Sequence, residues 1–330
     1  MSQKIQIALI GTGFGNKVLS PVIQRNPFCE LKAVANSSSN WRRVVSAADI
    51  DAVVIATPPR NQAPIALLAM QNKKHVFCEK PLALSAAQAQ KLLTAARRVG
   101  VSHVVDFEFP EIAAFRKAKS LLEKGFIGKI RHVAVSWNVE TLANKMRVQS
   151  WKTETREGGG ALFSFVCHSF YYLEWFAGNI KKLDARLFHT RGLPGSGDTL
   201  AHLFLEFKSG AAATLSMSTD AIFGNGHRIE FYGEKGKIVL DNPTADYAKG
   251  FKLFLGTRKD SGMQEIRCGD KAMSPCTDGR IEPVSRLFNR FVFWIQTGKA
   301  TRPSFKEGCR VQYLLDAAWT SHKKRTRVSV

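Results

Sequence analysis

An apolar strand that runs directly into a glycine-rich turn is the feature that most constrains the fold of this chain. Residues 4–10 (KIQIALI) predict a buried strand, and apolar residues at 18, 19, 22 and 23 then repeat at helical spacing. The turn between them consists of Gly11, Thr12, Gly13, Phe14, Gly15 and Asn16. This order of strand, glycine turn and helix is typical of the first unit of a dinucleotide-binding βαβ fold.

The residues of this turn have separate expected roles. Gly11 permits the tight turn, Gly13 lets the backbone approach a pyrophosphate, and the amino terminus of the following helix attracts the anion. The third small residue, which usually allows the helix to pack closely on the strand, is replaced by Asn16. We therefore expect the six residues of the turn to bind the cofactor, with Asn16 as a departure from the usual pattern.

The end of the second predicted strand, residues 30–35, bears on the choice of cofactor. An acidic residue at this position would bind the ribose hydroxyls of NAD and repel a 2′-phosphate. The chain has Asn36 and Ser37 there, with Arg42 and Arg43 close behind. These residues favour NADP over NAD. The alternative, that the two arginines only solvate a short helix, is nearly as well supported by the sequence.

Strands and helices continue to alternate through the first third of the chain. Residues 50–57 form a nearly continuous apolar run, which is typical of a strand buried on both faces. The remaining predicted elements are a helix at 64–71, a strand at 76–77, a helix at 85–99 and a strand at 101–105. This alternation predicts a parallel, doubly wound sheet. Glu79, Lys80 and Pro81 follow one of its strands, at the edge where such sheets bind ligands.

The pattern changes after Pro110, where consecutive strands with short turns replace the alternation. The expected elements are a helix at 112–124, a strand at 129–139, a helix from the triple glycine at 158–160 to 175, about five strands between 181 and 255, and helices at 284–297 and 306–323. We expect an α/β chain with a Rossmann domain at 1–120 and a second domain at 121–330. The second domain would hold a mostly antiparallel open sheet, with its last helix free to pack back toward the first domain.

Composition excludes several classes of protein. No uninterrupted apolar run is long enough to span a membrane, and residues 1–10 lack the features of a signal peptide. We expect a cytoplasmic protein whose six scattered cysteines are reduced. The cysteines and histidines do not fall at metal-binding spacing, so no metal is expected.

The net charge of +21 raises the possibility of a nucleic-acid partner. The basic residues are dispersed in pairs, however, and only residues 323–327 form a dense cluster. No known nucleic-acid module is visible. We therefore interpret most of this charge as a solvated surface that can also attract phosphorylated or acidic ligands.

The motifs occur in an order that resembles the Gfo/Idh/MocA oxidoreductases, a family that includes glucose–fructose oxidoreductase and inositol dehydrogenase. These motifs are GTGFG at 11–15, ATPP at 56–59, CEKPLA at 78–83, GGGAL at 158–162 with His168, and PSFKEG at 303–308. The resemblance covers essentially the whole chain and is most specific at Glu79-Lys80-Pro81. It implies a Rossmann domain and a second α/β domain, whose open sheet lies beside the active site and often forms a dimer interface. A homo-oligomer is therefore expected.

The resemblance also implies roles for individual residues. Lys80 would be the catalytic lysine beside the nicotinamide, Glu79 would line the cofactor, and the bond from Lys80 to Pro81 is often cis in this family. Further cofactor contacts are implied for Ala56, Thr57, Pro58, Gln62 (where the family commonly has histidine), Trp151 and Lys152.

The main departure from the family pattern is Ser164. Many relatives have an aspartate here, four residues before the histidine that corresponds to His168, and both act with the lysine in proton transfer and substrate binding. At this spacing Ser164 and His168 share one helix face. A hydroxyl can donate a hydrogen bond but cannot hold the negative charge that tunes a lysine. We expect Lys80, Ser164 and His168 to face the substrate, with Lys80 and His168 as the catalytic pair.

These features together predict hydride transfer between nicotinamide C4 and a hydroxyl- or carbonyl-bearing carbon. The expected substrate is a sugar, a cyclitol or a nucleotide-linked sugar, with Lys80 as proton donor or acceptor. The alternative is a cofactor-binding regulatory or structural protein without turnover. Ser164 in place of the aspartate favours that alternative.

Overall fold

The structure of the chain is a computed structural model, which describes residues 3–38, 40–244, 246–269 and 278–330. The chain divides into two compact units, each with most of its contacts inside itself. The first unit comprises Met1–Glu108 and Arg280–Tyr313, and the second comprises Phe109–Gly279 and Leu314–Val330. The predicted division at 120/121 differs from this one in two ways. The chain leaves the first unit at Glu108, and a late segment returns to it because α8 (Ile281–Thr297) packs on α1 (Ser20–Arg25).

A five-stranded sheet forms the centre of the first unit, in the order β2-β1-β3-β4-β5. Its strands are β1 (Ile5–Ile10), β2 (Cys29–Ala35), β3 (Ala52–Ile55), β4 (His75–Cys78) and β5 (His103–Val105). All four neighbouring pairs are parallel, which confirms the predicted doubly wound sheet. All four residues of β3 are buried, as its apolar run predicts.

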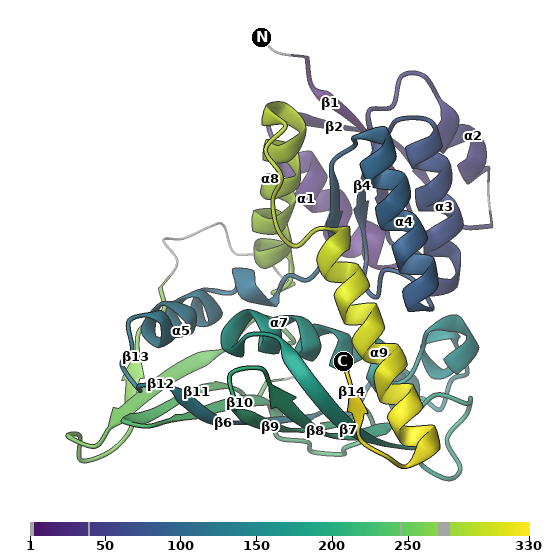
Figure 1. Cartoon of the computed structure of the whole chain (residues 1–330). Helices are drawn as coiled ribbons and strands as arrows, with labels where there is room; N and C mark the ends of the chain where they lie inside the picture. The colour runs from purple at the N-terminus through teal and green to yellow at the C-terminus, as the bar shows by residue number, and fades with distance from the viewer. Residues whose placement is uncertain (1–2, 39, 245, 270–277) are drawn as a thin grey trace. The chain divides into compact units, whose positions relative to one another are not determined.

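Helices lie on both sides of this sheet (Figure 1). Besides α1 and α8 they are the π-helix η1 (Gly15–Leu19), α2 (Trp41–Ser46), α3 (Pro59–Gln71), α4 (Ala86–Val99) and the start of α9 (Phe305–Lys324). Phe288 and Phe291 of α8 pack edge-on against Phe77 of β4, with ring centroids 5.6 and 5.8 Å apart. The returning segment therefore completes the core on one face of the sheet.

The predicted start of α3 is wrong by five residues, because the helix begins at Pro59 rather than at Pro64. Proline is well suited to the first turn of a helix, where its missing N–H has no intrahelical partner to lose. Pro64 then lies inside the helix, where it removes one backbone hydrogen bond without ending the element.

The second unit is built on a nine-stranded sheet in the order β13-β12-β11-β10-β6-β9-β8-β7-β14. Its strands are β6 (Ile130–Asn138), β7 (Ile180–Phe188), β8 (Leu200–Phe207), β9 (Ala212–Ser218), β10 (Gly226–Gly233), β11 (Gly236–Asn242), β12 (Lys252–Thr257), β13 (Gln264–Ile266) and β14 (Val328–Ser329). Every neighbouring pair is antiparallel except β6 with β9. The predicted mostly antiparallel sheet is confirmed.

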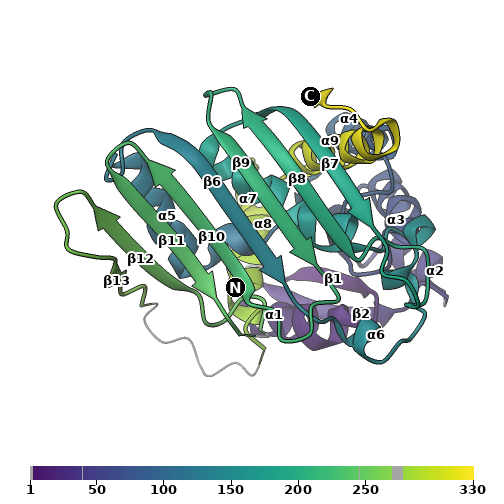
Figure 2. The same ribbon diagram turned by 90° about the horizontal axis from the view of Figure 1, so that it is seen from below.

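Two helices, α5 (Ala113–Glu123) and α7 (Cys167–Ala177), cover one face of this sheet, while the other face is open (Figure 2). Phe176 of α7 packs between Phe115 of α5 and Phe231 of β10. The shorter helical segments are η2 (Phe109–Glu111), α6 (Leu142–Lys145), η3 (Trp151–Thr153), η4 (Thr155–Glu157) and η5 (Leu162–Val166). Large side chains from the helices and strands therefore form the core on the covered face.

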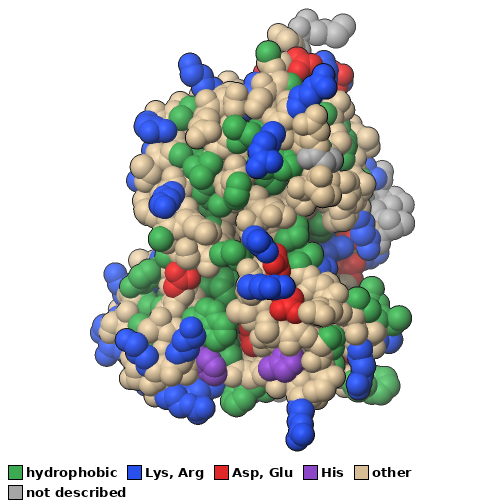
Figure 3. Space-filling view, turned by 90° about the vertical axis from the view of Figure 1, so that its right-hand side faces the viewer, with side chains coloured by type: hydrophobic (Ala, Val, Ile, Leu, Met, Phe, Trp, Pro, Cys, Tyr) green, Lys and Arg blue, Asp and Glu red, His purple; other side chains and the backbone are tan. Residues whose placement is uncertain are grey.

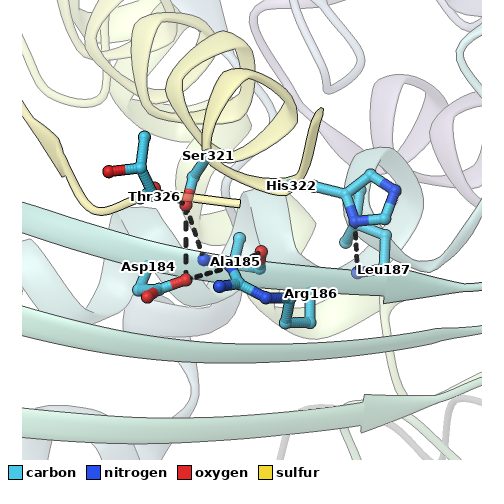
Figure 4. Close-up of polar contacts among 7 residues, drawn as sticks. All are labelled: Asp184, Ala185, Arg186, Leu187, Ser321, His322 and Thr326. Atoms are coloured by element: carbon cyan, nitrogen blue, oxygen red, sulfur yellow. Dashed lines mark hydrogen bonds and ion pairs between the residues drawn. The ribbon is translucent and has the colours of Figure 1, made fainter. Parts of the chain in front are cut away.

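The end of the chain closes one edge of the nine-stranded sheet (Figure 4). β14 pairs with β7, and the side chains of α9 satisfy the next two backbone donors of β7. The N–H of Ala185 donates to Ser321 Oγ at 2.9 Å, and the N–H of Leu187 donates to His322 Nδ1 at 3.1 Å. Ser321 Oγ also donates to the carbonyl of Thr326 at 2.7 Å. These bonds protect a sheet edge that would otherwise be open to another strand.

Figure 3 shows how charged side chains are distributed on one face of the molecule. On the face drawn in Figure 3, Lys and Arg side chains are scattered, with acidic side chains between some of them. No helix in the described part of the chain combines the length and apolarity that crossing a membrane requires. Five of the six cysteines are free thiols, and Cys276 lies outside the described residues.

Candidate functional site

The glycine turn after β1 has the geometry that a dinucleotide requires. Gly11 has φ +126°, and a Cβ there would lie 2.1 Å from the carbonyl oxygen of Ala56, at the end of β3. At Gly13, by contrast, a Cβ would meet no atom within 4 Å. The backbone at Gly13 thus borders open space at the start of a helix, where a pyrophosphate can approach the N–H groups. These residues fit the dinucleotide that the sequence predicts.

The structure also explains the departure at Asn16. A Cβ on Gly15 would contact the Leu9 side chain at 3.4 Å, so this glycine already provides the close packing of helix on strand. Asn16 is exposed and does not have to be small. Thr12 is also exposed, and the guanidinium of Arg280 lies 5.1 Å from the centre of the Phe14 ring.

The end of β2 offers an exposed arginine close to the predicted ribose position. Asn36 Oδ1 accepts hydrogen bonds from Ser38 N at 3.0 Å and from Ser38 Oγ at 2.9 Å, which shapes the turn after the strand. Arg42 lies in the first turn of α2, exposed, with its guanidinium 4.4 Å from the centre of the Trp41 ring. Stacking orients the guanidinium while leaving its N–H donors available.

Gln62 is fully buried, and its amide links the ends of two strands. Its Nε2 donates to the carbonyl of Thr57 at 3.3 Å, and its Oε1 accepts from the thiol of Cys78 at 2.8 Å. These bonds fix the loop that carries Ala56, Thr57 and Pro58. Contact of Gln62 and of this loop with the cofactor stays a prediction.

Lys80 lies where the sequence predicts, directly beyond β4. The parallel ladder continues past the strand ends, because Glu79 N donates to Ile55 O and Asp106 N donates to Cys78 O, both at 2.8 Å. The bond between Lys80 and Pro81 is cis, as expected. Since Cys78 pairs with Val105, Glu79 lies across from Asp106, and their side chains leave the sheet on the same side.

A cluster of three carboxyl groups surrounds Lys80, and sequence reasoning missed two of them. Asp106 and Glu108 follow β5 and are only 1% and 7% exposed. Neither carboxyl oxygen of Asp106 accepts a hydrogen bond from the described residues. The hydrogen bond between Asp106 and Glu79 is therefore one that a protonated Asp106 donates. Burial, reinforced by repulsion from Glu79 and Glu108, raises the pKa of Asp106 well above its usual range.

The other two carboxyls of the cluster face cations. Burial raises the pKa of Glu108 to about 7, and attraction to Lys80 opposes that rise. Burial likewise raises the pKa of Glu79, opposed first by Lys80 and then by the hydrogen bond from Asp106. Arg280 also attracts Glu79 and Glu108. With Asp106 neutral, two carboxylates face two cations, so the cluster is balanced in charge.

In the second unit, the triple glycine allows close packing at the start of the helix that carries His168. A Cβ on Gly159 would lie 2.4 Å from the carbonyl oxygen of Trp151, and one on Gly160 (φ +96°) would lie 2.4 Å from Asp198 Oδ1. The other oxygen of Asp198 accepts from Leu162 N at 2.8 Å, which caps this helix start. Burial raises the pKa of Asp198 to about 7. Sequence reasoning missed this residue as well.

The remaining predicted residues also lie in the second unit. Ser164 in η5 is partly exposed, whereas His168 in the first turn of α7 is 5% exposed, with its ring 4.9 Å from that of Phe109. Trp151 is 36% exposed, and the Lys152 ammonium lies 5.7 Å from the centre of its ring. The structure thus groups Lys80 with the glycine turn in one unit, and Ser164 with His168 in the other. Their joint action stays a prediction.

No cluster of three or more His, Cys, Asp or Glu residues in the described part of the chain could hold a metal ion. The three carboxyls around Lys80 are therefore interpreted through protons and the neighbouring cations.

Two family models match the chain. One, described as an oxidoreductase family with an NAD-binding Rossmann fold, matches residues 17–107. The other, described as the GFO/IDH/MocA C-terminal domain, matches residues 115–239. The two models describe parts of the same family, and together they cover more than half of the chain.

Curated relatives match over nearly the full length. An uncharacterised oxidoreductase of Synechocystis sp. is 29% identical over 360 residues, which cover 100% of this chain and 97% of the relative. Levoglucosan dehydrogenase of Pseudarthrobacter phenanthrenivorans is 25% identical, with 99% and 98% covered. Myo-inositol 2-dehydrogenase of Thermotoga maritima is 29% identical over a shorter stretch, with 59% and 57% covered.

Among solved structures, levoglucosan dehydrogenase in complex with NADH and L-sorbose has the same fold. It superposes with a TM-score of 0.89 at 24% identity, and the match covers 100% of this chain and 99% of the other.

Proposed function

We propose that this chain, which belongs to the Gfo/Idh/MocA family of oxidoreductases, transfers a hydride between nicotinamide C4 and a hydroxyl- or carbonyl-bearing carbon of a sugar, a cyclitol or a nucleotide-linked sugar. The chain is an NAD-binding oxidoreductase of the sugar and cyclitol dehydrogenase type. The names of its relatives, levoglucosan dehydrogenase and myo-inositol 2-dehydrogenase, support this class of substrate.

The position of Lys80 is the observation that carries this proposal. Lys80 follows β4 at the carboxyl edge of a parallel sheet, where doubly wound folds bind their ligands, and it attracts the buried carboxyls of Asp106 and Glu108. When bound, the dinucleotide supplies or accepts the hydride. Lys80 would then protonate the substrate oxygen in reduction, or take its proton in oxidation. His168 would hydrogen-bond the same oxygen or a neighbouring hydroxyl, and Ser164 would help to orient it.

The cofactor residues in this proposal are those of the glycine turn, the end of β2 and the loop after β3. Glu79, Trp151 and Lys152 are further proposed cofactor contacts. NADP is the preferred cofactor, because no carboxylate follows β2 and the stacked Arg42 offers its donors to a 2′-phosphate. NAD is the alternative form that this turn would also accept.

We place self-association on the open face of the nine-stranded sheet. Phe188 and Phe204 on this face are 52% and 61% exposed, and they alternate with buried leucines on the covered face. Exposed aromatic side chains on an open sheet are typical of a contact with another copy. Light scattering tests this point: the wild type should form an oligomer that Phe204→Glu weakens, and a monomeric wild type would contradict it.

A second candidate function is cofactor binding without turnover, which the serine at position 164 favours. One experiment separates the two candidates. Levoglucosan, myo-inositol and L-sorbose are each incubated with oxidised or reduced cofactor while the absorbance of the reduced nicotinamide is followed. Turnover of any of the three supports the dehydrogenase. Tight cofactor binding in a fluorescence titration, without turnover of a wider sugar panel, would support the regulatory protein instead.

A further inference from the structure

The carboxyls that follow β5 stand close to Lys80 in the same unit of the fold. Asp106 and Glu108 follow β5 two residues apart, in a tight turn where Phe107 N donates to Val105 O at 2.8 Å. Asp106 lies across from Glu79 at the end of the neighbouring strand, because Asp106 N donates to Cys78 O at 2.8 Å. Both are more than nine-tenths buried. The Lys80 ammonium attracts all three carboxyl groups. Glu79 is bound further by the N–H of Lys80, which donates to Glu79 Oε2 at 3.3 Å.

The Asp106 carboxyl is buried without hydrogen-bond donors around it among the described residues. Neither of its oxygens accepts a hydrogen bond from the described residues, although burying such a group without donors is costly. The Asp106 carboxyl donates a hydrogen bond to Glu79 and is attracted by Lys80. A protonated Asp106 therefore holds the Glu79 carboxylate in position, and Glu108 is the member of the cluster that remains able to exchange protons.

We propose that Glu108 relays protons between Lys80 and solvent, that Asp106 positions Glu79 beside them, and that these carboxyls replace the aspartate for which this chain has Ser164. This inference rests on the proposed function, since it assigns Lys80 a proton to move. In this scheme Lys80 acts on the substrate oxygen. Asp106 is a positioning residue, and Glu108 acts through Lys80.

The proton steps balance in the direction of substrate oxidation. The substrate O–H bond breaks as neutral Lys80 takes the proton, while the carbon that bears this oxygen loses its hydride to the nicotinamide. The Lys80 ammonium then gives a proton to the Glu108 carboxylate, which leaves a neutral amine and a neutral carboxyl. Glu108 finally releases the proton to water, and reduction runs through the same steps in reverse.

Charged groups from three elements face Glu108. Glu79 and Lys80 come from the end of β4, Asp106 precedes it on the segment after β5, and Arg280 is the residue before α8. Burial raises the pKa of Glu108, and attraction to Lys80 and Arg280 limits that rise. The result is a carboxyl that titrates near pH 7, as a relay at neutral pH requires.

The test uses the full chain as Glu108→Gln, which has nearly the same shape but cannot titrate. Asp49→Asn removes an exposed carboxylate of the same unit and serves as the matched control. With whichever of levoglucosan, myo-inositol and L-sorbose the wild type turns over, we expect kcat of Glu108→Gln to fall at least about tenfold. The ionisation near pH 7 should vanish from its pH profile. KM and the affinity for NADPH should not change, and Glu108→Asp should restore part of the profile.

A second measurement does not depend on turnover. The denaturant midpoint of the wild type should fall, relative to that of Glu108→Gln, as pH rises between about 4.5 and 7, because the folded state holds the Glu108 proton more tightly than the unfolded chain. The relay would be overturned if the denaturant midpoints of the wild type and Glu108→Gln changed with pH in parallel. Identical pH profiles of kcat for the two proteins would also overturn it. If the wild type oxidises or reduces no sugar while the two stability curves still diverge, the proposed function fails and the titrating carboxyl stands.

Discussion

Asp106 keeps its proton and donates a hydrogen bond to Glu79 across the ends of two neighbouring parallel strands. Glu79 belongs to the Glu-Lys-Pro motif that first indicates a site in this sequence, whereas Asp106 belongs to no recognised motif. The Lys80 ammonium therefore faces three carboxyls, of which Asp106 and Glu108 are buried. The electrostatic surroundings of the proposed catalytic lysine are therefore set largely by the strand next to its own.

The state of Asp106 can be tested by two substitutions at that position. An asparagine keeps the shape and can still donate to Glu79, so Asp106→Asn should change the free energy of unfolding at neutral pH by less than about 1 kcal/mol. Asp106→Ala removes the donor and leaves a cavity, and should cost about 2–3 kcal/mol. Urea denaturation of both variants measures this difference. Equal losses for the two variants would contradict a protonated Asp106.

The sign of the pH dependence at Asp106 follows from its raised pKa. A folded state that holds this proton more tightly than the unfolded chain gains stability below the ordinary pKa of 3.8 and loses it as pH rises toward the folded pKa. The wild type should therefore lose stability relative to Asp106→Asn as the solution becomes more alkaline.

Two glycines of the same turn should fail in different ways when alanine replaces them. Gly11→Ala places a Cβ 2.1 Å from a backbone oxygen at φ +126°, so it should destabilise the fold by about 1–3 kcal/mol. Gly13→Ala meets no protein atom and should leave the unfolding free energy within about 0.5 kcal/mol of the wild type. Its Cβ would occupy the space meant for the pyrophosphate, so NADPH affinity should fall at least about tenfold. If Gly13→Ala is stable and binds NADPH as the wild type does, the pyrophosphate does not bind at Gly13.

The preference for NADP can be measured by fluorescence titration with NADPH and NADH. Wild-type protein should bind NADPH more tightly, and Arg42→Ala should lose about tenfold in NADPH affinity while its NADH affinity stays the same. Arg98→Ala, which removes an exposed arginine of α4, is the matched control. Equal or tighter binding of NADH by the wild type would refute the preference.

Much of the fold could be predicted because its signals are local. The strand and glycine turn at residues 4–15, the apolar run at 50–57 and the later run of strands each record a periodicity or a turn that the structure confirms. The start of α3 was missed because Pro58 and Pro59 look like the end of an element, although proline at the first helical position is compatible with a helix.

The candidate site was only partly predictable for a different reason. Asp106 and Glu108 follow a strand of three residues and resemble an ordinary polar loop until the pairing of β5 with β4 places them beside Glu79. Asp198 precedes β8, about forty residues from the helix that it caps, and only the close approach at Gly160 indicates it. Such partners depend on register and on backbone contacts between distant segments, which one sequence does not reveal.

The central claim is that Lys80 moves the proton in a hydride transfer, and Lys80→Ala tests it most directly. The measurement is kcat with the sugar or cyclitol that the wild type turns over, together with NADPH affinity, and Lys91→Ala on the exposed side of α4 is the control. We predict that Lys80→Ala loses at least about a hundredfold in kcat while it binds NADPH as the wild type does, and that Lys91→Ala matches the wild type in both. Unchanged turnover by Lys80→Ala would contradict the account.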